Sequence, residues 1–341
     1  MFGRIVIGLF TLVFVAALVA VGIGYLHFSR FTETPLGVHD AKIEIHGGES
    51  LRSVIASLRD AGVDAGNDIE WQLLAARMHV RSKMQIGEYA IKPDMTPEQL
   101  LHNISTGKVI QYSFTIVEGW NMRDLRTALK AAPDMRHALS VTSDSALMEQ
   151  LGRSRTHPEG RFLPETYAYT RDSSDIDLLA RAAKAMDAAV AVAWAQRDPT
   201  LPLKSPHEVL ILASIIEKET GVPDERARIA GVFVRRLQAG MKLQTDPSVI
   251  YGLGSSYDGN IRKRDLYTDT PYNTYTRTGL PPTPIAMPGR AALQAATHPA
   301  PGDALYFVAS GNGGHVFSAT LGEHNAAVAR YLKSQREKQS Q

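Results

Sequence analysis

Two glutamates separated by a single lysine end an apolar stretch of this sequence. The segment 211-ILASIIEKETG-221 places Glu217 and Glu219 directly after a run of aliphatic residues. A carboxyl group that is partly desolvated and near the negative end of a helix has a raised pKa, because both effects disfavour its charged form. Such a group can act as a general acid at neutral pH. These considerations do not choose between the two glutamates, and solvated residues at a helix end remain the alternative.

The helix that carries these glutamates has clear start and stop signals. Ser205, Pro206 and Glu208 have the spacing of a capping box with proline in the first helical position. Gly221 and Pro223 are typical of a helix end. Apolar residues between these signals cover nearly the whole circumference at about 100° per residue, so the sequence predicts a helix that is buried on most sides.

Neutral hydrogen-bonding side chains gather in two loop-like segments farther along the chain, residues 240–254 and 270–289. Sugar hydroxyls require donors and acceptors, and sugar rings stack on aromatic faces, so these loops fit a saccharide ligand. The residues that we single out as candidates for saccharide binding are Gln244, Asp246, Asn273 and Tyr275. A turn residue before Pro247 is the alternative reading of Asp246.

A third segment, residues 305–325, predicts a β-hairpin that turns through SGNGG and places His315 at a strand start. His298, His315 and His324 are not at metal-ligand spacing on one element, which favours structural or solvated histidines. The sequence contains no HExxH, GxxxxGK[ST] or GxSxG motif. We therefore predict neither a metal nor a cofactor.

The composition of the 341-residue chain excludes several classes of protein. Its net charge of +2 with scattered basic residues is unlike the footprint of a nucleic-acid binder. The absence of cysteine excludes disulfides, thiol catalysis and cysteine-bound zinc. Charged residues at 21% and apolar residues at 44% are typical of an ordinary folded protein, long enough for two or three domains.

The N-terminal region predicts a retained membrane anchor. From Ile5 to Ser29 there is no Asp, Glu, Lys or Arg, and this length can cross a bilayer of roughly 30 Å. A cleaved signal peptide, with a shorter apolar region, is the alternative. Arg4 precedes the span, which favours a cytoplasmic N-terminus. We expect an anchor over residues 1–30, a linker over 31–41, and the remainder in the periplasm beyond the inner membrane.

Residues 42–108 predict a small β-α-α-β unit that resembles a LysM module. Ser50 and Thr96 are at helix N-cap positions, and Gln99 completes a capping box. A structural spacer is the alternative to a glycan-binding role. The expected fold class is α+β, with this LysM-like domain between the anchor and a larger catalytic domain of residues 109–341.

Four segments in order carry a resemblance to a known family. They are ILASIIEKETG, RLQAGMKLQTDPSVIYGLG, PYNTYTRTGLPPTPIAMPG and LYFVASGNGGHVFS. Behind one N-terminal anchor, this series resembles the YceG-like family of endolytic murein transglycosylases. The resemblance covers essentially the whole chain and is strongest over residues 205–333. It implies that the first glutamate of the EKET run, Glu217, is the catalytic residue.

The resemblance implies a lyase that cuts β-1,4 bonds between N-acetylmuramic acid and N-acetylglucosamine within nascent peptidoglycan strands. Such enzymes use no water and leave 1,6-anhydro ends, which would terminate strand elongation beside penicillin-binding synthases. In this reading Gln244, Asn273 and Tyr275 orient the saccharide, Asp246 assists, and His315 lines the cleft. The alternatives are a muramidase with Asp246 or Glu165 as second carboxylate, and a non-catalytic peptidoglycan-binding scaffold.

Overall fold

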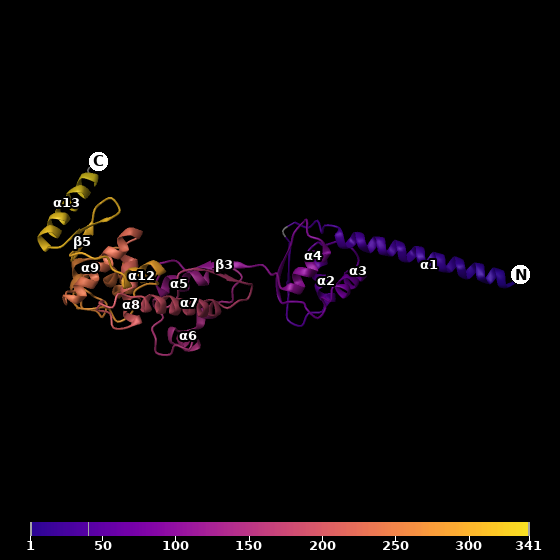
Figure 1. Ribbon diagram of the computed structural model, residues 1–341, viewed down its shortest axis with the longest axis horizontal. Coiled ribbons are helices and arrows are strands. Elements are labelled where there is room, and N and C mark those ends of the chain that lie inside the picture. The colour runs from indigo at the N-terminus through magenta and orange to yellow at the C-terminus, as the bar shows by residue number, and fades with distance from the viewer. Residues whose placement is uncertain (1, 40, 340–341) are drawn as a thin grey trace. The chain divides into compact units, whose positions relative to one another are not determined.

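The computed structural model describes residues 2–39 and 41–339, and contacts divide the chain into two compact units. Unit 1 comprises Met1–Tyr112 and Thr170–Asp172, and unit 2 comprises Ser113–Tyr169 and Ser173–Gln341. Within the described residues, helices accompany three two-stranded sheets (Figure 1). The predicted α+β class is confirmed.

The regular elements of the first part of the chain are α1 (Phe2–Glu33), β1 (Ala41–Ile45), α2 (Leu51–Asp60), α3 (Asp68–Arg77), β2 (Gly87–Ile91) and α4 (Pro97–Thr106). The β1-α2-α3-β2 order is the predicted one, with β1 and β2 antiparallel. Ser50 accepts a hydrogen bond from the Ser53 amide, and Thr96 and Gln99 form the predicted capping box. Assignment of this unit to a LysM-like module stays a prediction.

Helix α1 is long and apolar enough to cross a membrane over Ile7–Glu33, with a mean hydropathy of 2.6. Its last turn belongs to the core of unit 1, because Phe31 is only 5% exposed and meets Trp71 edge to face with ring centroids 5.4 Å apart. Leu36, in the segment predicted as a linker, is also buried in this core. The apolar helix therefore runs into the folded unit without a free spacer.

The elements from Tyr112 onward are β3 (Tyr112–Thr115), α5 (Met122–Lys130), α6 (Asp144–Gln150), β4 (Thr166–Tyr169), α7 (Asp175–Ala195), α8 (Pro206–Glu219), α9 (Arg226–Gln238), α10 (Asp246–Leu253), α11 (Lys263–Tyr267), α12 (Arg290–Thr297), β5 (Tyr306–Ala309), β6 (His315–Ser318) and α13 (Leu321–Gln339). Three short 3-10 turns complete them: η1 (Ala138–Val141), η2 (Pro223–Glu225) and η3 (Gly254–Ser256).

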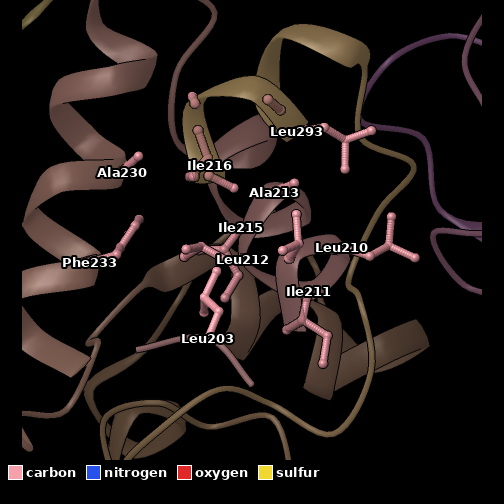
Figure 2. Packing of buried hydrophobic residues seen from close by; sticks show 14 of the residues in the cluster. Leu203, Leu210, Ile211, Leu212, Ala213, Ile215, Ile216, Ala230, Phe233 and Leu293 are labelled. Atoms are coloured by element: carbon pink, nitrogen blue, oxygen red, sulfur yellow. The ribbon is translucent and has the colours of Figure 1, made fainter. Parts of the chain in front are cut away.

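Helix α8 is the centre of the unit 2 core. Every residue from 209 to 216 is buried, and α7, α9 and α12 pack around the helix. Figure 2 shows side chains of this cluster, among them those of Leu212, Ile216 and Leu293. The prediction of a helix buried on most sides is confirmed, and Ser205 is its N-cap.

The predicted hairpin is also confirmed. β5 and β6 are antiparallel, and Ala309 pairs with His315 directly before the turn. Helix α13 packs against both strands. Figure 1 shows α13 and β5 in yellow and orange at the C-terminal end of the chain. These last elements form a wall of the site described below.

The buried end of α1 generates a prediction for stability. Phe31→Ala removes a core ring that packs on Trp71, and we expect it to lower the stability of unit 1 by about 3 kcal/mol. Ile69→Ala, in the same unit but 69% exposed, should change stability by less than about 0.5 kcal/mol. Amide hydrogen exchange of the full chain in detergent measures both. Equal effects of the two substitutions would show that the end of α1 is not part of this core.

Candidate active site

A cavity of about 480 Å³ opens beside the C-terminal end of α8. Glu219 lines it together with three of the predicted saccharide-binding residues, Gln244, Asp246 and Tyr275. Further lining comes from β5 and α13. The remaining lining residues are Arg236, Leu243, Tyr306, Phe307, Val308, Leu321, His324, Asn325 and Val328. Polar, aromatic and carboxylic groups thus share one pocket of the size that suits a small-molecule or sugar ligand.

The Glu219 carboxyl group has the electrostatic character of a general acid. Burial raises its pKa to about 7, and the negative charge of Asp246 acts in the same direction. A hydrogen bond donated by the Thr245 hydroxyl to Oε1 opposes the shift without cancelling it. A carboxyl group with this pKa is protonated in a large fraction of molecules at neutral pH.

Two segments place the polar groups around Glu219: the loop that leads into α10 carries Gln244 and Thr245, and the loop after α11 carries Tyr275. The Tyr275 hydroxyl donates to Asp246 Oδ1 at 2.5 Å, and desolvation together with this contact raises the pKa of Tyr275. Gln244 has a positive φ of 53°, and its Oε1 accepts a hydrogen bond of 3.2 Å from Arg236 Nη1. These contacts fix the orientation of the predicted residues before a ligand arrives.

Asn273 has a different environment from the other predicted saccharide-binding residues. It is 1% exposed, and its Nδ2 donates to the carbonyl oxygens of Asp265, Leu266 and Thr268 at 2.7 to 3.2 Å. Its Oδ1 accepts from the Tyr275 amide at 2.8 Å. The structure therefore places Asn273 beneath the loop, where it holds Tyr275 in position, and the cavity lining does not include it.

His315 is held at the start of β6 by one carboxylate. Its backbone amide donates to Glu225 Oε1 at 2.8 Å, and its Nδ1 lies 2.7 Å from Glu225 Oε2. Its ring contacts the rings of Phe307 and Phe317, which also contact each other. His315 therefore ties the hairpin to η2, and it is not a lining residue of the cavity.

Glu217, the catalytic residue implied by the resemblance, faces another part of unit 2. Its Oε2 accepts a hydrogen bond of 2.9 Å from the Gly289 amide, and its Oε1 lies 3.5 Å from Arg226 Nη2. The side chain is 5% exposed, and burial raises its pKa. Gly289 caps α12 and Arg226 begins α9, so Glu217 joins the ends of three helices. The Glu219 cavity does not include it.

Three residues at or beside the cavity were not among the saccharide-binding candidates from the sequence, which favours a structural or solvated role for His324. Thr245 is between the predicted Gln244 and Asp246, so its polar neighbours were an available signal. Arg236 and His324 line the cavity from elements whose proximity only the fold reveals. His324 stacks on Tyr306 with ring centroids 5.2 Å apart. Among the described residues, no group of three His, Asp or Glu side chains could hold a metal ion.

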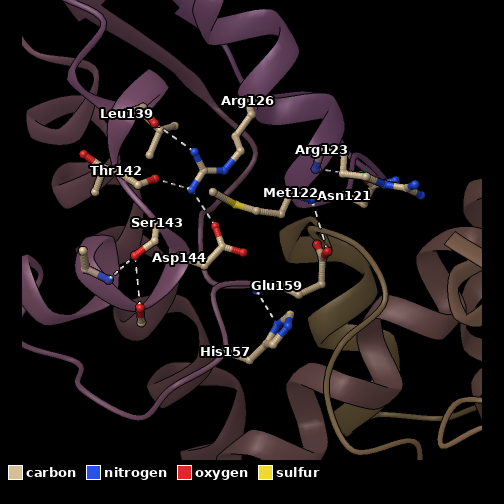
Figure 3. Close-up of polar contacts among 12 residues, drawn as sticks. Asn121, Met122, Arg123, Arg126, Leu139, Thr142, Ser143, Asp144, His157 and Glu159 are labelled. Atoms are coloured by element: carbon tan, nitrogen blue, oxygen red, sulfur yellow. Dashed lines mark hydrogen bonds and ion pairs between the residues drawn. The ribbon is translucent and has the colours of Figure 1, made fainter. Parts of the chain in front are cut away.

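A second buried acid, Glu159, belongs to a polar network outside this cavity. It is 2% exposed, and burial raises its pKa to about 7. Its Oε2 accepts a hydrogen bond of 3.1 Å from the Met122 amide at the start of α5. Figure 3 shows this contact and, nearby, the Arg126 guanidinium bound to the carbonyls of Leu139 and Thr142. We interpret Glu159 as a cap that fixes α5.

Unit 2 contains the four sequence segments, the buried helix α8 and the polar cavity. The sequence model of the YceG-like family matches residues 43–330. This chain belongs to the YceG-like family. The match includes α8, the loops that carry Gln244 and Tyr275, and the C-terminal hairpin.

Two named relatives and one solved structure are similar to this protein over most of its chain. A Bacillus subtilis (strain 168) protein named endolytic murein transglycosylase is 31% identical over 318 residues, 87% of this chain and 86% of the relative. A Streptococcus pneumoniae (strain ATCC BAA-255 / R6) protein of the same name is 26% identical, over 95% of this chain and 64% of the relative. The crystal structure of the yceG-like protein lmo1499 from Listeria monocytogenes matches with a TM-score of 0.55 and 29% identity, over 84% of this chain and 98% of that one.

The raised pKa of Glu219 predicts a pH-dependent stability difference. Because the folded pKa of about 7 lies above the ordinary value of 4.5, unfolding releases a proton between these pH values. The stability contributed by the protonated carboxyl group is therefore complete below about pH 4.5 and lost as the pH rises through 7. Glu219→Gln stays neutral, so its stability relative to the native protein should increase by up to about 3 kcal/mol from pH 4.5 to 8. Urea unfolding at several pH values measures it, and a pH-independent difference would contradict the shift.

Proposed function

We propose that this protein is an endolytic lytic transglycosylase that cuts peptidoglycan glycan strands internally and leaves 1,6-anhydro ends. The observation that carries the proposal is the protonatable Glu219 in a cavity lined by Gln244, Asp246 and Tyr275. The name shared by the Bacillus subtilis and Streptococcus pneumoniae relatives supports the same activity. A lyase of this class needs one acid that later acts as a base.

On geometry, we assign the acid to Glu219 in preference to Glu217. The two side chains are separated by about 200° around α8, so they face different surroundings. Glu219 faces the cavity, whereas Glu217 accepts the Gly289 amide and pairs with Arg226. A general acid must reach the oxygen that it protonates. Assignment of the acid to Glu217 remains the competing hypothesis.

The proposed reaction moves one proton out and back. Protonated Glu219 donates its proton to the glycosidic oxygen as the bond to the anomeric carbon of N-acetylmuramic acid breaks, with positive charge developing on that sugar. The resulting carboxylate then accepts the proton of the C6 hydroxyl of the same sugar. The C6 oxygen forms the new bond to the anomeric carbon, so the acid is regenerated and no water is consumed.

The neighbours of Glu219 suit this cycle. Thr245 donates to Oε1 and so fixes the carboxyl group in one orientation. Asp246 raises the pKa of Glu219 in the resting state and carries a negative charge that favours the developing cation. Asp246 itself accepts a hydrogen bond from the Tyr275 hydroxyl, and this bond holds the Asp246 carboxylate in place. In this proposal Asp246 is an electrostatic neighbour and not a nucleophile.

The apolar helix α1 supports attachment of the enzyme to a membrane. We propose that it anchors the chain in the inner membrane with the N-terminus in the cytoplasm and both units in the periplasm. The burial of Phe31 in unit 1 keeps that unit at the end of the anchor. Nascent strands emerge at this surface, so cleavage there would end their elongation beside the penicillin-binding synthases that make them.

The decisive experiment compares two neutral substitutions. Glu219→Gln should reduce cleavage of nascent glycan by at least about 100-fold, because it removes the transferable proton. Glu217→Gln keeps an acceptor for the Gly289 amide and should retain activity within about tenfold. Mass spectrometry of the products measures the rate and also identifies the anhydro end, which is lighter than a reducing end by one water.

Three outcomes would contradict parts of this proposal. Reducing ends from the native protein would identify a muramidase, and intact strands would identify a binding scaffold. Loss of cleavage in Glu217→Gln together with activity in Glu219→Gln would assign the acid to Glu217. Equal thermal unfolding of both variants shows that the loss does not come from misfolding.

The pH profile of cleavage tests the electrostatics of the acid separately. Since free Glu219 must be protonated, kcat/KM should fall about tenfold per pH unit above its pKa of about 7. Asp246→Asn removes a negative charge that raises this pKa, so the falling limb should move to lower pH. A limb that stays in place or moves to higher pH in this variant would contradict the role of Asp246.

A further inference from the structure

Arg236 is a buried cation in the cavity wall. Its side chain belongs to α9, only 7% of the residue is exposed, and it lines the same cavity as Glu219. Among the described residues no Asp or Glu forms an ion pair with it within 4 Å, and Glu219, in the same cavity, is the carboxyl group whose charge acts on it. Buried guanidinium groups are normally paired with an anion or have all donors occupied, because desolvation of an unpaired charge is costly.

The hydrogen bonds of Arg236 use only part of its guanidinium group. Nε donates to the Leu305 carbonyl at 2.7 Å. Nη1 donates to the carbonyls of Lys242 and Leu243 at 3.1 and 2.8 Å and to Gln244 Oε1 at 3.2 Å. Nη2 has no hydrogen-bond acceptor among the residues that the structure describes. Its two N–H donors are therefore the free end of a side chain whose other nitrogens are fixed.

We propose that Arg236 Nη2 binds the terminal oxygen of the lactyl group on C3 of N-acetylmuramic acid. This inference rests on the proposed function, and it deepens it by naming a residue that reads the sugar. The lactyl group is the substituent that distinguishes muramic acid from glucosamine, and it ends in a carboxylate or, where a peptide is attached, an amide carbonyl. Both are planar acceptors that suit a guanidinium N–H.

The surroundings of Arg236 support this choice over the acetamido group. The cavity lining already provides Gln244, Tyr275 and Asn325 as neutral partners for acetamido and hydroxyl groups. The guanidinium carbon lies 5.1 Å from the Tyr306 ring centroid, so an aromatic face backs the cation. A fixed, buried positive charge with free donors is best satisfied by the group on the strand that can carry negative charge.

The test measures binding without turnover, in the full chain carrying Glu219→Gln. Calorimetry compares an alternating N-acetylglucosamine–N-acetylmuramic acid tetrasaccharide with a chitin tetrasaccharide of equal length. Adding Arg236→Lys should weaken binding of the muramic tetrasaccharide by at least about tenfold and leave chitin binding within about twofold. Arg235→Lys is the matched control, because the Nε of Arg235 donates to the neighbouring Ala304 carbonyl at 2.7 Å from outside this cavity. It should leave both affinities within about twofold.

Equal weakening of both ligands by Arg236→Lys, or no weakening of either, overturns the proposal. If the Arg236→Lys variant unfolds, the Glu219→Gln protein is tested alone. We then expect the muramic tetrasaccharide to bind more tightly than the chitin tetrasaccharide. Added salt should lower the affinity for the muramic tetrasaccharide only. Equal affinities for the two ligands overturn the proposal. The products of the native protein are measured separately, so a failed lactyl contact is distinct from a failed transglycosylase assignment.

Discussion

The proposed chemistry depends on one constraint, the burial of the Glu219 carboxyl group at the C-terminal end of the buried helix α8. α8 can place Glu219 there because its own side chains from 209 to 216 are enclosed by α7, α9 and α12. The Thr245 hydroxyl donates a hydrogen bond that orients the carboxyl group, and the negative charge of Asp246 raises its pKa. A rigid apolar core is thus what allows a polar group with an unusual pKa to have a defined position.

Much of this arrangement was predictable from local sequence signals. Ser205, Thr96 and the SGNGG turn follow short-range rules of capping and hairpin formation, and all of them are confirmed. The choice between Glu217 and Glu219 was not predictable from such signals. Their environments come from Gly289 and from Thr245, which are far from both in sequence, and only the fold brings these partners to opposite sides of one helix.

The polar loops show a second limit of sequence reasoning. Gln244, Asp246 and Tyr275 line the cavity. Asn273 instead donates its side-chain hydrogen bonds to three nearby backbone carbonyls. An amide side chain can serve a ligand or a loop equally well, and composition does not separate these uses. The position of Arg236 in the cavity lining was not predicted, because an arginine within a helix is ordinarily expected at the surface.

Part of the cavity lining comes from β5 and α13, the last regular elements that the structure describes. If α1 leads the chain through a membrane, the acid emerges well before the strands and helix that enclose it. A molecule exported only as far as α12 would therefore carry Glu219 without Tyr306, Phe307 and the other lining residues of these two elements. Such an intermediate would lack part of the pocket in which the Glu219 carboxyl group is buried.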